Sequence, residues 1–84
     1  MQIDSIVRKL REIQDKRTHC QCSRDKIVEK LAFDRVISLV SECTDAQDVI
    51  TRCQAVSDSI VARNNDALIL KKAYLYAVAV AAHE

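Results

Sequence analysis

Residues 66–82, DALILKKAYLYAVAVAA, decide the fold class, because nearly every residue beyond the lysine pair is apolar. The run is too short to span a membrane, which takes about 20 consecutive apolar residues, and Lys71 and Lys72 interrupt it. Alternating Tyr, Leu and Val would also fit a strand. However, no other segment has a strand pattern that could pair with it, and alanine is depleted in strands. The stretch therefore predicts a helix, which we expect to be, with the second helix of the chain, the most buried of the bundle.

Two further helices are predicted upstream of this stretch. The first, near residues 4–17, has apolar residues at steps of three and four, which is the spacing of one helix face: Ile3, Ile6, Leu10 and Ile13. The second follows a short connection and begins after Ser23, a favourable N-cap. Its apolar residues cover more than half of the helical wheel, and Phe33 and Ile37 fall on the remaining side. This helix is expected either to be central and touched on two sides or to be kinked near Phe33.

A third helix is predicted to begin at Thr44. Residues 44–47 have the Thr-x-x-Gln spacing of a capping box, in which both side chains satisfy free backbone amides. This helix is expected to end near Arg63, with Asn64 closing it in a left-handed conformation and Asn65 capping the next helix. The sequence thus predicts one all-α domain over residues 1–84, a small antiparallel bundle of about four helices.

The composition argues against an enzyme. The 84 residues include no Gly, Pro or Trp, and glycine is the usual material of phosphate-binding loops and nucleophile elbows. A chain this small also has little room for a substrate pocket. We expect no catalytic residues, no cofactor and no small-molecule substrate. No secretory signal or membrane span is recognised in the sequence, and we expect a cytoplasmic protein with reduced thiols.

The cysteines leave one alternative open. His19, Cys20 and Cys22 form a cluster of soft ligands, and Cys43 and Cys53 could complete a tetrahedral zinc site. The nine residues between Cys43 and Cys53 do not match the short spacing of structural zinc pairs, and both residues fall on apolar helix faces. Free thiols are therefore expected, with a metal-stabilised helical module or disulfides as the alternatives.

A basic N-terminal segment offers a second alternative. The first 30 residues hold eight basic and five acidic residues, although the whole chain has a formal net charge of only +1. A helix-turn-helix arrangement would turn Asp45, Asp48 and Asp58 toward phosphates, which is unfavourable. Weak nucleic-acid binding through the N-terminal helix thus stays an alternative, and a solvated helix face is the simpler interpretation.

The expected function is protein binding by a small accessory, adaptor or inhibitor protein, a type that phages and mobile elements often encode. Apolar surface beyond the needs of one thin core favours a partner, either a second copy in a homodimer or a different protein. Tyr74 and Tyr76 lie about 200° apart on the helical wheel, so we expect at least one to point away from the other helices. The predicted interface comprises Leu70, Tyr74, Tyr76 and Val80 of the last helix and Ile3, Leu10 and Ile13 of the first.

Overall fold

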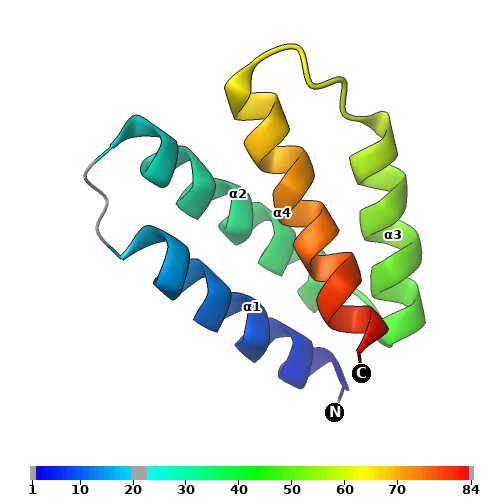
Figure 1. The fold of residues 1–84 in the computed structure, drawn as a ribbon. Coiled ribbons are helices and arrows are strands. Elements are labelled where there is room, and N and C mark those ends of the chain that lie inside the picture. The colour runs from blue at the N-terminus through cyan, green and yellow to red at the C-terminus, as the bar shows by residue number, and fades with distance from the viewer. Residues whose placement is uncertain (1, 20–22, 84) are drawn as a thin grey trace.

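The computed structural model describes residues 2–19 and 23–83, and these form four helices (Figure 1). The elements are α1 (Gln2–Thr18), α2 (Arg24–Ser41), α3 (Ala46–Ser59) and α4 (Asn65–Ala82). The described residues contain no strand. The predicted all-α bundle is therefore confirmed, including a helix in the apolar stretch near the C-terminus.

The helices form two antiparallel hairpins, α1 with α2 and α3 with α4 (Figure 1). Helix α4 packs closely against both α3 and α2 and also contacts α1, whereas α2 and α3 touch each other only slightly. The two hairpins therefore contact each other mainly through α4. Because α2 and α4 run in the same direction, their N-terminal ends lie at the same end of the bundle (Figure 1).

A single core joins all four helices, and α2 contacts both α1 and α4. The side chain of Phe33, expected on the far side of the apolar stripe, is fully buried, and Ile37 is buried beside it. Leu31 and Ile27, which belong to the wide apolar sector predicted for this helix, are 59% and 49% exposed. The wide apolar sector of α2 left its register ambiguous, and contact with α1 and α4 selects the face that bears Phe33.

Buried polar contacts hold α1 on α2. The side-chain amide of Gln14 donates to the carbonyl oxygen of Lys30 and to a carboxylate oxygen of Asp34, each at 2.9 Å. Gln14 is buried, so its loss would leave these acceptors without that donor. Near the C-terminal end of α1, Arg17 forms an ion pair with Glu29 of α2. These contacts fix how the two antiparallel helices align.

The helix caps confirm one prediction and correct two. Ser23 caps α2 as expected, accepting from the amide of Lys26. Asn64 has an extended backbone with φ of −143°, and its side chain accepts from the amide of Ala67, so it caps α4 instead of closing α3. Asn65 is the first residue of α4.

Helix α3 ends at Ser59, four residues earlier than predicted. The ammonium group of Lys71 in α4 donates to the carbonyl oxygens of Ser57 and Ile60. These bonds satisfy acceptors that a helix C-terminus leaves free. Contact with α4 therefore supports an end that the sequence of α3 does not mark.

The N-cap of α3 is Asp45, one residue beyond the predicted Thr44. The Asp45 carboxylate accepts from the amide of Asp48 at 2.8 Å. The Asp48 carboxylate in turn accepts from the amide of Thr44 at 3.0 Å, and this bond holds the pKa of Asp48 below its usual range. The cap is thus made by Asp45 and Asp48, an Asp-x-x-Asp pair that overlaps the predicted Thr44 and Gln47.

We expect Asp45→Ala to lower the free energy of unfolding by about 0.5–2 kcal/mol, the usual cost of removing an N-cap side chain. Gln47→Ala should be nearly silent, since Gln47 is exposed and is not the capping partner. Chemical denaturation of both variants measures the difference. A larger loss for Gln47→Ala than for Asp45→Ala would restore the cap predicted from the sequence.

Candidate protein-binding groove

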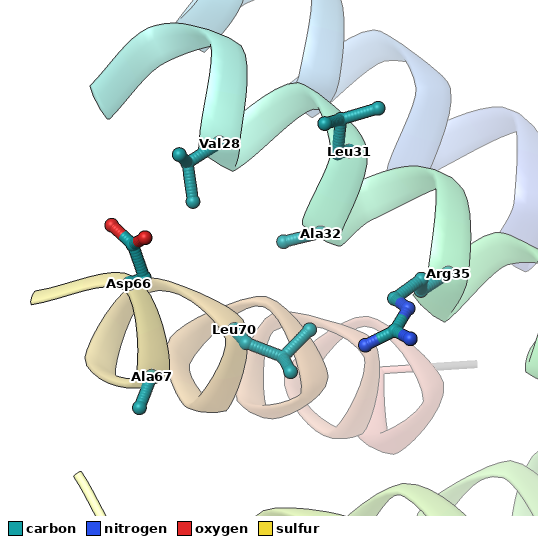
Figure 2. Close-up of a pocket in the computed structure, with 7 residues that line it drawn as sticks. All are labelled: Val28, Leu31, Ala32, Arg35, Asp66, Ala67 and Leu70. Atoms are coloured by element: carbon teal, nitrogen blue, oxygen red, sulfur yellow. The ribbon is translucent and has the colours of Figure 1, made fainter. Parts of the chain in front are cut away.

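An apolar groove lies between α2 and α4, with a volume of about 350 Å³ (Figure 2). Helix α2 lines one wall and the N-terminal half of α4 lines the other. The groove exists because α3 barely touches α2, so no third helix covers this part of the boundary. The lining residues are Val28, Leu31, Ala32, Arg35, Asp66, Ala67 and Leu70.

The groove combines small and large apolar side chains. Ala32 of α2 and Ala67 of α4 are short, and they leave space that the neighbouring Leu70 only partly fills (Figure 2). Leu31 lies along the α2 side and is 59% exposed. Ile27, one turn earlier on the same helix, extends this apolar surface. A recess beside projecting leucine and isoleucine side chains is the shape that protein contacts fill.

Oppositely charged side chains stand at the two ends of the groove, and the acidic one is already paired. Asp66 lies at one end and Arg35 at the other, with Leu70 between them (Figure 2). The guanidinium group of Arg24 donates to both carboxylate oxygens of Asp66, at 2.8 and 2.6 Å, and these bonds lower the pKa of Asp66. Within the described part of the chain, Arg35 forms no ion pair. The guanidinium group of Arg35 is therefore available to a partner at the open groove.

The predicted interface residues are only partly accessible. Ile3, Leu10 and Tyr74 are buried in the core of the chain, and a partner of the folded chain cannot reach them without rearrangement. The partly buried set is Ile13, Leu70, Tyr76 and Val80. Of all seven residues, Leu70 alone lines the groove between α2 and α4.

Neither tyrosine points away from the other helices, so that expectation was wrong. The ring of Tyr76 packs against Phe33, with ring centroids 5.7 Å apart, and the guanidinium of Arg17 lies 5.2 Å from its centroid. Tyr74 is only 8% exposed. Two residues about 200° apart can both be covered because α4 has neighbouring helices on opposite sides.

The outward surface of α4 forms a second, more open depression of about 370 Å³. Lys72, Leu75, Tyr76 and Ala79 line it, and Leu75 is 38% exposed. The described residues that line this depression all belong to one helix, and they include a lysine. The groove between α2 and α4 is more enclosed, has the more exposed side chain at its rim, and is the stronger candidate for a docking surface.

The cysteines that the structure describes are buried free thiols. Burial raises the pKa of the Cys53 thiol to about 12 and also raises the pKa of Cys43. No group of three or more potential metal ligands occurs among residues 2–19 and 23–83. His19 is exposed, whereas Cys20 and Cys22 lie outside the described residues, so the predicted ligand cluster is not tested.

Several basic residues near the N-terminus are already engaged. Arg17 pairs with Glu29, and Arg24 pairs with Asp66. These contacts connect helices within the bundle and offset part of the local positive charge. The basic segment formed by the first 30 residues therefore has less free charge than the sequence alone indicates.

No family model, curated protein or solved structure matches the chain. Across the described residues, every helix falls short of the length and apolar character that a membrane crossing requires.

Proposed function

We propose that this chain is a protein-binding module whose docking surface is the groove between α2 and α4. One observation carries the proposal: Leu31 and Ile27 are largely exposed beside an open apolar recess. Covering such side chains removes apolar surface from water, at about 25 cal/mol per Å². A partner that presents apolar side chains to the groove would gain this term without any rearrangement of the core.

The groove is suited to recognition. Its two charged residues, Arg35 and Asp66, can align a partner through complementary charge. General acid–base catalysis needs a group whose pKa lies near the working pH, whereas the pKa of Asp66 is lowered further from neutrality and arginine does not give up its proton in proteins. We therefore propose a contact function, as an accessory, adaptor or inhibitor protein, and assign no catalytic residue.

We place the protein in the cytoplasm. The buried thiols of Cys43 and Cys53 are free, and reduced buried cysteines are ordinary in a reducing compartment. In this setting the two side chains act as small apolar core residues of the bundle.

Photo-crosslinking in cells that express the protein tests the proposed surface. A photoreactive amino acid at position 31 should give cross-linked protein products, because Leu31 lies at the rim of the groove. The same residue at position 51 is the matched control, since Thr51 is exposed on α3 and does not line the groove. Equal yields from both positions, or no product from position 31, would refute the proposed surface.

A further inference from the structure

We propose that the groove binds the same groove of a second copy of this chain, forming a two-fold symmetric dimer. The inference rests on the proposed function and names its partner. The carrying observation is the opposite charge of two side chains, Asp66 at one end, where it is paired with Arg24 but still partly exposed, and Arg35 at the other (Figure 2). A surface with this polarity is complementary to its own reverse.

The symmetry follows from the direction of the groove. The two grooves face each other across a two-fold axis that lies in the plane of the interface and at right angles to the groove direction. The second groove then runs in the opposite direction. Arg35 of each copy then lies over Asp66 of the other, and the contact forms twice. An axis along the groove would instead place Arg35 against Arg35, which is unfavourable.

Asp66 can accept a second guanidinium group while it keeps the first. A carboxylate has about four lone-pair sites, and the two hydrogen bonds from Arg24 use two of them. Arg35 of the other copy would complete an Arg–Asp–Arg arrangement at each end of the interface. Asp66 remains partly exposed, so it is open to such a contact.

The apolar part of the surface is also self-complementary. Leu31 projects at the α2 side of the groove, next to the recess left by Ala32 and Ala67. In the antiparallel arrangement, α2 of each copy faces α2 of the other, so the exposed Leu31 side chains of the two copies cover apolar surface of the opposite α2, and Ile27 extends the contact by one turn.

Charge favours a second copy over an acidic or a basic peptide. An acidic peptide would pair with Arg35 but meet the carboxylate of Asp66 at the other end. A basic peptide would pair with Asp66 but be repelled by Arg35 at the other end. The reversed groove satisfies both ends at once, which is the pattern of an isologous interface.

The patch covers a few turns of two helices, so the interface is expected to fall below the standard size of about 1,600 Å² and the dimer to be weak, with a Kd in the micromolar range. Sedimentation of the full chain between about 10 and 500 μM should therefore show a monomer–dimer equilibrium.

Charge reversal gives the decisive experiment. Arg35→Glu places a carboxylate against Asp66 of the second copy, and Asp66→Lys places an ammonium group against Arg35 of the second copy. Each variant alone should dimerise at least about tenfold more weakly than the wild type. An equimolar mixture of the two should restore dimerisation beyond that of either variant alone. The mixed dimer has two contacts between positions 35 and 66. One joins the unchanged Arg35 and Asp66, and the other joins the two substituted positions, a carboxylate and an ammonium group. Both contacts therefore join opposite charges.

Controls separate association from folding. Helical circular dichroism of each variant checks the fold, because Asp66→Lys also removes the partner of Arg24. Leu31→Glu, which keeps both charged ends, should abolish the dimer independently. Thr51→Lys changes the net charge away from the groove and should leave the dimer intact.

A wild-type chain that remains monomeric at the highest concentration would overturn the dimer, as would a mixture that restores no association. If position 31 nevertheless cross-links to a different protein in cells, the proposed docking surface survives while the second copy is excluded as its occupant. If position 31 also gives no cross-link, both the dimer and the proposed docking surface are refuted.

Discussion

Replacing Phe33 with alanine is expected to lower the free energy of unfolding by about 3–5 kcal/mol, the usual cost of removing a buried aromatic side chain. Phe33 is fully buried in the core and packs against the ring of Tyr76. The substitution would leave a cavity where α4 rests on α2. Because a domain of this size has a stability of only several kcal/mol, a large fraction of the chain should unfold at room temperature.

Leu31→Ala on the same helix is the matched control. Its side chain is 59% exposed, and the expected change is within about 0.5 kcal/mol for a chain held at a monomeric concentration. Urea titration followed by helical circular dichroism compares the two variants. A greater loss of stability for Leu31→Ala would mean that α2 is rotated from the orientation described, and the groove would not exist in this form.

The thiol of Cys53 is expected to react with iodoacetamide about a thousandfold more slowly in the folded chain than in the unfolded chain near pH 8, because the thiolate is the reactive form. Burial, with a smaller contribution from neighbouring Cys43, raises its pKa from 9.0 to about 12, so the thiolate becomes rare. Brief labelling followed by peptide mass spectrometry measures each cysteine separately. Equally fast labelling of Cys53 in the folded and unfolded chains would contradict its burial.

The same burial predicts a loss of stability at alkaline pH. A thiol with a raised pKa in the folded state favours folding fully below its unfolded pKa of 9.0, and this contribution disappears as the pH rises toward about 12. Burial raises the pKa of Tyr74 as well, and its effect has the same sign. Cys53→Ala should flatten the alkaline fall in melting temperature, whatever its cost at neutral pH. An unchanged slope in this variant would rule out Cys53 as a cause.

Helical periodicity and capping residues were sufficient to predict the fold class. Ser23 caps α2 as expected, and the spacing of apolar residues located the first three helices, whereas the continuous apolar run located the fourth. The start of α3 was one residue off because two capping patterns overlap there, and only the three-dimensional structure shows that Asp45 bonds to the Asp48 amide. The end of α3 depends on Lys71 of α4, a contact that no local pattern reveals.

The groove was harder to predict than the helices. Of its lining residues, Leu70 was the only one among the predicted interface positions, and the tyrosines proved to be packed within the chain. A groove between helices depends on how they are placed, and helix α2 is apolar over so much of its surface that its buried face could not be assigned. The short side chains at Ala32 and Ala67 were a weak signal, since alanine is also common in closely packed helices.

The most direct test of the docking surface is a map of amide chemical shifts as the concentration of the isotopically labelled chain is raised. We expect the shifts that change to cluster in residues 24–35 and 66–70, around Leu31 and Leu70. Changes confined to the outer face of α4, around Leu75 and Ala79, would contradict this expectation. So would a map without any change, combined with the absence of a cross-link from position 31.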